Sequence, residues 1–136
     1  MKVMLDKGAY MPEYAHSTDA GADLRSPVSF SIMAGDSVTV DTGVHVEITD
    51  GYVGMLKSKS GLNVKHGIVS EGVVDEGYTG SIRVKLYNHG VETYTVHKGD
   101  KITQIVIMPV HHATFEQVDS LDETERGNGG FGSTGR

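Results

Sequence analysis

Five short segments of this chain are richer in glycine, hydroxyl groups and charge than the residues around them. They are DAGADLRSP (19–27), LKSKSGL (56–62), EGVVDEGYTG (71–80), HKGDKITQI (97–105) and RGNGGFGSTGR (126–136). Glycine amides, hydroxyl groups and cations together bind anions such as phosphate, and a carboxylate beside them can take a proton from water. These residue types are therefore compatible with an anionic ligand and with hydrolysis.

In LKSKSGL, Ser60 is a candidate N-cap for a helix of one or two turns that a glycine ends at position 67. The Ser60 hydroxyl and the Gly61 amide would then converge with Lys59 at the start of this helix, which favours an anion. Lysines that are simply solvated on a loop are an equally good interpretation.

EGVVDEGYTG has an aspartate between an apolar pair and a glycine turn. A strand ending at Asp75, followed by a tight turn through Tyr78 into residues 82–86, would form a β-hairpin. Asp75 at its lip could then act as a base, and Tyr78 could lie flat on a ring. The alternative is that Asp75 only satisfies turn amides while Tyr78 caps the core.

The C-terminal RGNGGFGSTGR has the outer glycine spacing of a phosphate-binding loop. Ser133 stands where that motif needs lysine, and no helix follows, so it is not a Walker motif. Its amides, with Arg126, Ser133 and Thr134, could still wrap a phosphate chain, and Phe131 could stack on a planar ring. On composition alone, a disordered terminus is the simpler interpretation.

The other two segments and the histidines carry weaker signals. Alone, DAGADL and KGDKI each indicate an ordinary turn between strands. The seven histidines follow no metal-ligand pattern, and the adjacent His111 and His112 would face opposite ways on a strand. We therefore expect no structural histidine metal site.

The elements that must position these segments have the periodicity of strands. GVHVEI (43–48) and SIRVKLY (81–87) alternate strictly between apolar and polar residues, and SVTV (37–40) and ETYTV (92–96) do so over shorter lengths. ITQIVIMPV (102–110) is almost continuously apolar and predicts a strand covered on both sides. Many short strands separated by glycine turns predict an all-β sandwich or barrel.

Composition excludes several classes of protein. The chain has 136 residues, no cysteine and a formal net charge of −6, which suits one domain without disulfides and argues against general nucleic-acid binding. It has no apolar run long enough for a membrane span and does not begin like a signal peptide. We expect a cytoplasmic protein (host cytoplasm if viral), with one domain over 1–118 and a flexible tail over 119–136.

Taken in order, the five segments resemble the motifs of the trimeric dUTPases, from about residue 20 to the C-terminus: AGADL, SKSGL, GVVDEGYTG, GDKITQI and RGNGGFGSTG. The third and fifth are the most specific. The resemblance implies a jelly-roll-like distorted β-barrel with one short helix, and a homotrimer with active sites at subunit interfaces. It also implies hydrolysis of dUTP to dUMP and pyrophosphate, which lowers dUTP and supplies dUMP for thymidylate synthesis.

By the same resemblance, each motif has a role in the reaction. Asp75 is the base that activates water for attack on the α-phosphate and also holds the 3′-hydroxyl. Tyr78 packs under the deoxyribose, where a 2′-hydroxyl would not fit. Backbone groups of Gly72, Val73 and Val74 read the edge of uracil.

The resemblance assigns binding of the phosphates and Mg²⁺ to the first, second and fourth motifs. Ser60, Gly61 and Lys59 hold phosphate oxygens, although the family usually has arginine where this chain has Lys59. Gln104 acts on the phosphates and Asp23 on Mg²⁺ through water, which suits a metal that is reluctant to lose its hydration shell.

The fifth motif would close over the ligand, in a neighbouring subunit's site. Phe131 covers uracil, while Arg126, Ser133 and Thr134 grip the γ-phosphate. Gly132 and the other glycines let the backbone approach the phosphates closely.

Two departures and two rival functions stay open at this point. Lys59 offers the phosphates a single point charge, whereas the usual arginine would bind them through two parallel N–H groups. Lys57 could assist Lys59 in binding phosphate. The loop before the third motif, GIVSEGVVD, is shorter than in many members. The related dCTP deaminases would need their own arginine–serine signature and a catalytic glutamate. A regulatory nucleotide-sensing protein would use the same fold to recognise a protein partner.

Overall fold

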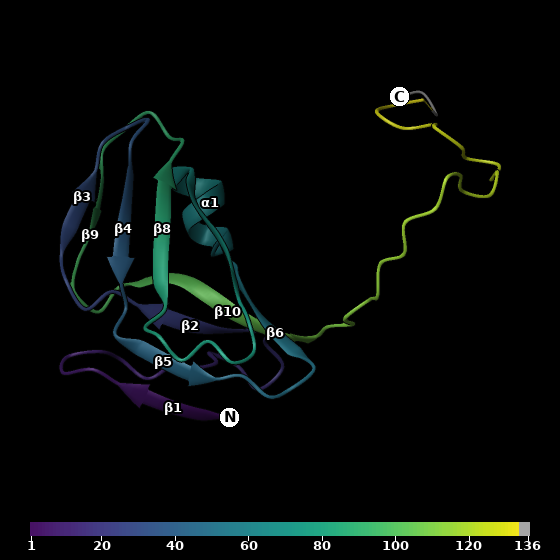
Figure 1. The fold of residues 1–136 in the computed structure, drawn as a ribbon. Coiled ribbons are helices and arrows are strands. Elements are labelled where there is room, and N and C mark those ends of the chain that lie inside the picture. The colour runs from purple at the N-terminus through teal and green to yellow at the C-terminus, as the bar shows by residue number, and fades with distance from the viewer. Residues whose placement is uncertain (134–136) are drawn as a thin grey trace.

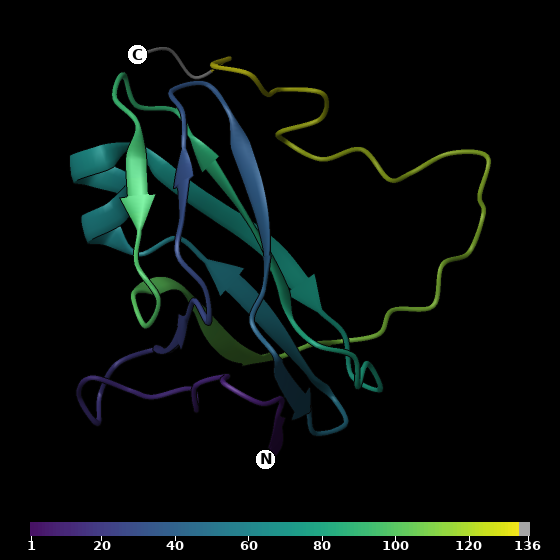
Figure 2. The same ribbon diagram turned by 90° about the vertical axis from the view of Figure 1, so that its left-hand side faces the viewer.

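The structure is a computed structural model that describes residues 1–133 (Figures 1 and 2). Over these residues the chain forms ten strands and one helix. Their bounds are β1 (Lys2–Leu5), β2 (Gly21–Arg25), β3 (Phe30–Ile32), β4 (Ser37–Asp41), β5 (Val44–Glu47), β6 (Tyr52–Lys57), α1 (Ser60–His66), β7 (Ile68–Val74), β8 (Arg83–Asn88), β9 (Tyr94–Val96) and β10 (Lys101–Pro109). The mostly-β fold with one short helix is confirmed.

The strands form one large antiparallel sheet and two small ones. The large sheet has the order β2-β10-β6-β7-β8-β4, and the pairs β1-β5 and β3-β9 flank it. The large sheet curls, so that β4 and β8 stand steeply to β2 and β10 (Figure 1), and it wraps around the apolar core. The alternation predicted from the sequence is confirmed, since Val44, Val46, Ile82 and Leu86 are each at most 4 % exposed.

Strand β10 is an interior strand of the large sheet, between β2 and β6, as expected for an apolar run, but it is not covered on both sides along its whole length. Ile102 and Ile105 are buried, whereas Met108 is 45 % exposed. The pairing with β2 ends at Val106, while the pairing with β6 continues to Pro109. The last residues of β10 therefore extend beyond β2, which leaves them less covered within one chain.

The predicted helix is present as α1, but Ser60 is not its N-cap. Lys59 has the extended backbone of the N-cap position, and no side chain caps the helix. Ser60 is instead the first helical residue. The glycine stop is confirmed, because Gly67 ends the helix in the left-handed region with φ 68°. A methyl group at Gly67 would lie 2.6 Å from the backbone nitrogen of Gly90, so close approach also requires glycine there.

Strands β7 and β8 are antiparallel neighbours, as the hairpin interpretation predicts, but the turn between them is wide. Their pairing runs only from Ile68 opposite Asn88 to Ser70 opposite Leu86. The β8-facing backbone edge of residues 71–74 is therefore outside this ladder. GIVSEGVVD is thus mostly strand β7 and not a loop, and residues 75–82 form the connection, which we call the Asp75 loop.

Beyond β10, residues 110–133 contain neither helix nor strand, and they extend away from the sheets (Figure 1). The domain boundary expected at residue 118 stays a prediction. Across residues 1–133, no helix has the length and apolar character needed to cross a membrane.

Candidate functional site

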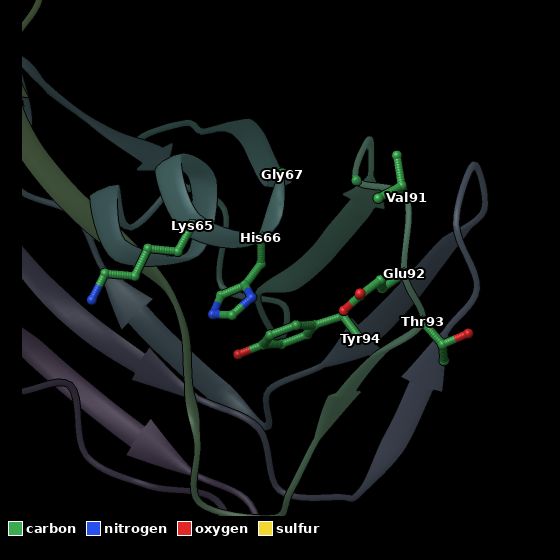
Figure 3. A pocket seen from close by; sticks show the side chains of 8 residues that line it. Lys65, His66, Gly67, Val91, Glu92, Thr93 and Tyr94 are labelled. Carbon is green, nitrogen blue, oxygen red and sulfur yellow. The ribbon is translucent and has the colours of Figure 1, made fainter.

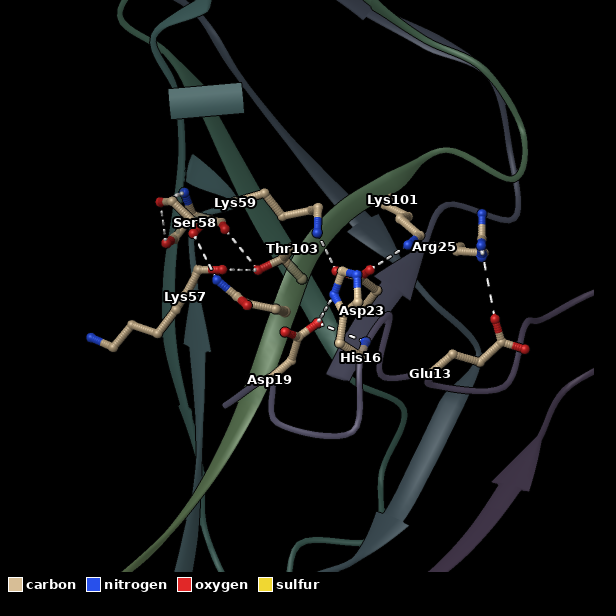
Figure 4. A network of polar contacts seen from close by, with 12 residues as sticks. Glu13, His16, Asp19, Asp23, Arg25, Lys57, Ser58, Lys59, Lys101 and Thr103 are labelled. Atoms are coloured by element: carbon tan, nitrogen blue, oxygen red, sulfur yellow. Dashed lines mark hydrogen bonds and ion pairs between the residues drawn. The ribbon is translucent and has the colours of Figure 1, made fainter. Parts of the chain in front are cut away.

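The first, second and fourth motifs lie side by side because of strand register. Asp23 in β2 is directly opposite Gln104 in β10. On the other edge of β10, Gln104 is opposite Lys57, the last residue of β6. Lys57 leads directly into Lys59 and Ser60 at the start of α1. Three segments that are far apart in the sequence therefore meet in one place (Figure 4).

Asp23 is the buried charge at the centre of this place. Its side chain is 5 % exposed and forms ion pairs with Lys59 and with Lys101, whose Nζ lies 2.6 Å from Asp23 Oδ2. Burial raises the pKa of Asp23, but the two ammonium groups more than offset this, so that the pKa lies below its ordinary value. Asp23 is therefore held in its ionised form.

A network of hydrogen bonds fixes the backbone that leads into α1 (Figure 4). Gln104 Nε2 donates to the Ser58 carbonyl at 3.1 Å, and Thr103 Oγ1 donates to the Lys57 carbonyl at 3.0 Å. The Ser58 hydroxyl bridges the backbone of Ser70 in β7, donating to its carbonyl and accepting from its N–H, both at 2.9 Å. The start of α1 is thus held by both of its neighbouring strands.

Gly21 in the first motif has a packing reason to be glycine. A methyl group at this position would lie 2.4 Å from Gln104 Oε1. Gly61 faces open space instead, and both Ser60 and Gly61 are exposed at the start of α1. Their hydroxyl and amide groups are accessible beside the two lysines. We call this group of residues the Asp23 cluster: Asp23, Lys59, Ser60, Gly61, Lys101 and Gln104.

The Asp75 loop presents an exposed carboxylate and an exposed ring. Asp75 follows the last residue of β7, and the Tyr78 N–H donates to its carbonyl at 3.2 Å. The Tyr78 ring is anchored by its hydroxyl, which donates to the Ser81 carbonyl at 3.0 Å, and Tyr78 remains 47 % exposed. A methyl group at Gly80 would lie 2.4 Å from the Tyr78 hydroxyl, so the ring needs glycine there. Tyr78 therefore does not cap the core.

The residues Gly72, Val73 and Val74 form the end of β7, next to Asp75. Val74 is buried and Val73 is 59 % exposed. Because the ladder to β8 ends at Ser70, one backbone edge of this segment is not used in sheet pairing. It offers N–H and C=O groups at fixed spacing to a ligand.

Within one chain, the Asp75 loop and the Asp23 cluster lie at opposite ends of the β6–β7 ribbon. Val74 is opposite Gly54 in β6, and Lys59 lies five residues further along. At a rise of about 3.3 Å per residue, the two ends are about 17 Å apart. The structure therefore brings Asp23, Lys59 and Gln104 together, but not Asp75 with them.

The described tail residues of the fifth motif, 126–133, form no hydrogen bond or ion pair with either group. Arg126 Nε donates to the Gly129 carbonyl at 2.9 Å, which closes a local turn. Phe131 is fully exposed, and the chain here extends away from the sheets (Figure 1). Phe131 and Gly132 both have positive φ, 52° and 90°. Ser133 is the last described residue, and Thr134 lies outside the described residues.

A separate cavity of about 430 Å³ lies beside the C-terminal end of α1 (Figure 3). The rings of His66 and Tyr94, with centroids 4.9 Å apart, line it together with Lys65 and Glu92. None of the expected site residues lines this cavity. Within residues 1–133 there is also no group of three or more His, Asp or Glu side chains that could hold a metal ion.

Lys101 is the member of the Asp23 cluster that sequence reasoning missed. Its spacing of three from Gln104 suggests opposite faces of a strand. A register shift between Lys101 and Thr103 changes this alternation and lets Lys101 reach Asp23. Lys57, considered as an assistant to Lys59, instead pairs with Glu71 across β6 and β7.

Comparison with known proteins gives a consistent result. Residues 7–135 match the family model described as dUTPase. A deoxyuridine 5'-triphosphate nucleotidohydrolase of Gloeothece citriformis is 45 % identical over 134 residues, covering 96 % of this chain and 92 % of that protein. Another of the same name, from Clostridium acetobutylicum, is 43 % identical with the same coverage.

Solved structures agree with the relatives. The Staphylococcus bacteriophage 80alpha dUTPase with dUpNHpp superposes with a TM-score of 0.92 at 32 % identity, covering 99 % of this chain and 98 % of that one. A mutant dUTPase from phage phi11 of S. aureus, described with a structural Mg(II) ion, has a TM-score of 0.83 at 29 % identity and covers 90 % of this chain and 98 % of that one.

Proposed function

The chain belongs to the dUTPase family, and we propose that it hydrolyses dUTP to dUMP and pyrophosphate, lowering dUTP and supplying dUMP for thymidylate synthesis. The observation that carries this proposal is the meeting of three motifs at the Asp23 cluster, where two lysines pair with one buried carboxylate and the exposed hydroxyl and amides at the start of α1 follow Lys59 directly in the chain. Such a group of donors suits a polyphosphate. No feature of the described residues favours deamination of dCTP or a purely regulatory role.

We assign the phosphates to the start of α1. Ser60 and Gly61 are exposed there and supply a hydroxyl and amide donors. Lys59 adds a charge that is 27 % exposed while it pairs with Asp23. Gln104 already donates to the Ser58 carbonyl, and it would position this backbone against the phosphate oxygens. Lysine in place of arginine gives one point charge, so the backbone donors carry more of the geometry.

Asp23 is assigned to the surroundings of Mg²⁺, through water. The residues fit this role only in part, because both carboxylate oxygens face ammonium groups and no cluster of carboxylates accompanies them among the described residues. They suit a metal held mainly by substrate phosphates and water, which is usual for Mg²⁺. When bound, Mg²⁺ would withdraw charge from the leaving pyrophosphate.

We assign the nucleoside to β7 and the Asp75 loop. The free backbone edge at Gly72, Val73 and Val74 would pair with uracil. Cytosine presents the opposite donor and acceptor pattern and would bury these backbone groups without pairing them, while the methyl group of thymine would clash. The exposed ring of Tyr78 would pack under the deoxyribose and exclude a 2′-hydroxyl. Asp75 would hold the 3′-hydroxyl and take a proton from the water that attacks the α-phosphate.

The distance between the two groups favours an active site built from different copies of the chain. A base must lie within hydrogen-bond reach of its water, about 3 Å, and the water about as close to phosphorus. About 17 Å between the groups in one chain is too far. We therefore propose a homotrimer in which the Asp75 loop of one subunit completes the Asp23 cluster of another.

The fifth motif would close this site. Its glycines allow Phe131 to cover uracil while Arg126, Ser133 and Thr134 hold the γ-phosphate. Gly132 would let the backbone approach the phosphates. The domain would then consist of residues 1–118, with 119–136 as the tail that orders over substrate.

Pyrophosphate release from dUTP, dTTP, dCTP and UTP, with Mg²⁺ and with a chelator, tests the activity. We expect rapid release from dUTP alone, weakened by chelation. No release from dUTP by the folded, metal-supplied protein would refute the proposal. Ammonia release from dCTP would replace it with deamination.

Co-expression of two inactive variants tests the shared site. Asp75→Asn damages one group and Lys59→Met the other, so random mixing should leave about a quarter of the sites intact. The matched control mixes Lys59→Met with Gln104→Ala, which damage the same group, and should restore nothing. Equal activity in both mixtures would contradict a site shared between copies.

A further inference from the structure

The second half of the Asp75 loop is fastened to the turn between β4 and β5. The Ile82 N–H donates to the Val44 carbonyl at 2.8 Å, and the Ile82 carbonyl accepts from the Thr42 N–H at 3.1 Å and its hydroxyl at 2.7 Å. The Ser81 hydroxyl donates to Asp41. These contacts hold the loop against β4 and β5, on the side away from β7.

His45 adds a side-chain contact between β5 and this loop. Its Nδ1 lies 2.7 Å from the carbonyl oxygen of Thr79, one residue after Tyr78. Its Nε2 lies 3.4 Å from Asp6 Oδ2, in the segment that follows β1. The Nε2 atom is buried and has no hydrogen bond of good geometry. The side chain as a whole is 17 % exposed.

The two ring nitrogens of His45 therefore face two acceptors. A neutral imidazole carries one N–H, so it can donate to Thr79 or to Asp6 but not to both. The second nitrogen then presents a lone pair to an oxygen. The imidazolium form carries an N–H on both nitrogens, so it donates to the Thr79 carbonyl and forms the ion pair with Asp6 at the same time.

The surrounding charges favour this charged form. The hydrogen bond to the Thr79 carbonyl raises the pKa of His45, burial lowers it, and Asp6 and Asp41 raise it, with a net result above the ordinary value of 6.5. On the β1 side, Lys2 and Glu47 neutralise each other at 3.0 Å. Asp41 also lies 3.5 Å from Arg83.

We propose that His45 is a positioning residue for the Asp75 loop, and that its protonated ring ties Thr79 to Asp6 and so holds the loop in place for catalysis. The inference rests on the proposed function, because the same loop carries Asp75 and Tyr78. Loss of the tie would allow Thr79 and the neighbouring Tyr78 ring to shift. His45 itself need not touch the substrate.

Two substitutions of His45 distinguish the effect of its N–H donor to Thr79 from the effect of its change in protonation. His45→Asn keeps an amide N–H near the position of Nδ1 at every pH, whereas His45→Phe keeps a ring but removes both donors. We expect His45→Phe to lower kcat/KM for dUTP by about five- to tenfold, the effect of one lost hydrogen bond, and His45→Asn to recover most of it.

The ratio of wild-type to His45→Asn kcat/KM is the readout that a merely structural role would not change. Ionisation of dUTP and binding of Mg²⁺ affect both proteins and cancel. We expect the ratio to fall by about twofold as pH rises from 6.5 to 9, because wild-type His45 then loses one of its two contacts. Asp6→Asn, at an exposed residue outside the site, should move this fall to lower pH.

NMR titration of the imidazole resonances, assigned with the His45→Asn variant, supplies a measurement that does not depend on activity. We expect a pKa above 6.5 in the wild type and a lower one in Asp6→Asn. A flat ratio between pH 6.5 and 9 in an active enzyme, or a His45 pKa that Asp6→Asn does not lower, would overturn the inference. Absence of dUTP hydrolysis in the wild type would instead refute the proposed function.

Discussion

Substitution of Lys101 tests whether its ion pair with the buried Asp23 carboxylate stabilises the folded protein. Lys101→Met takes away one of two ammonium groups from a carboxylate that is 5 % exposed, and keeps most of the apolar length of the side chain. Lys59 also pairs with Asp23 in the wild type, so we expect the carboxylate to keep one partner in this variant. The expected loss is therefore smaller than that of leaving a buried charge without any partner.

The magnitude follows from the contact that is lost. A hydrogen bond to a charged group contributes about 1.5–3 kcal/mol, and the lower end applies because the Lys101 side chain is 33 % exposed to screening by solvent. We expect the free energy of unfolding to fall by about 1.5 kcal/mol. For a chain of this size, this corresponds to a decrease of about 5 °C in Tm.

The pH dependence has a definite sign. The folded-state pKa of Asp23 lies below the ordinary value of 3.8, so its contribution to stability is present above that pH and is lost as pH falls through the folded-state pKa. The difference between wild type and Lys101→Met should therefore be complete at pH 7 and shrink below about pH 4.

Urea unfolding followed by circular dichroism, at pH 7, 5 and 3, measures this difference. Lys98→Met is the control, since it changes an exposed lysine of the same turn for which no ion pair is found among the described residues; its effect should stay within about 0.5 kcal/mol. Equal stability of wild type and Lys101→Met at pH 7, or a difference that grows as pH falls, would refute the reasoning.

Three further substitutions or deletions test the site. Gly21→Ala should displace Gln104, whose Oε1 would lie 2.4 Å from the new methyl group, and lower both dUTP turnover and Tm. Asp75→Asn should abolish turnover and leave binding of a non-hydrolysable dUTP analogue largely intact, as calorimetry would show. Deletion of residues 127–136 should reduce activity severely without changing Tm, because the described part of this tail contacts only itself.

The fold was predictable where one physical pattern decides the structure. Strict alternation along 43–48 and 81–87 places every second side chain in the core, and the structure confirms this. The N-cap of α1 was predicted at Ser60, one residue after its actual position at Lys59. Ser60 has a side chain typical of an N-cap, but Lys59 has the backbone conformation of one. Composition alone does not decide between adjacent residues here.

The candidate site was less predictable, because its geometry depends on register. The resemblance to the dUTPase motifs pointed to Asp23 and Gln104 as site residues, but not to their being direct partners across β2 and β10. Lys101 was missed because a bulge changes the face on which it lies. Neither register nor bulge leaves a clear signal in a single sequence, since both arise when strands pair.

The separation of the two groups has the same origin and the larger consequence. Along the chain, the second and third motifs are about a dozen residues apart, which suggests a single compact site. The chain instead passes through α1 and then runs the length of β7, antiparallel to β6, so that Asp75 ends at the far end of the ribbon from Lys59. A rigid antiparallel pair cannot bring its two ends together. If both groups act on one dUTP, a second copy of the chain must supply one of them. Within one chain, the short connection through α1 forces β7 to run antiparallel to β6, and this places Asp75 far from Lys59.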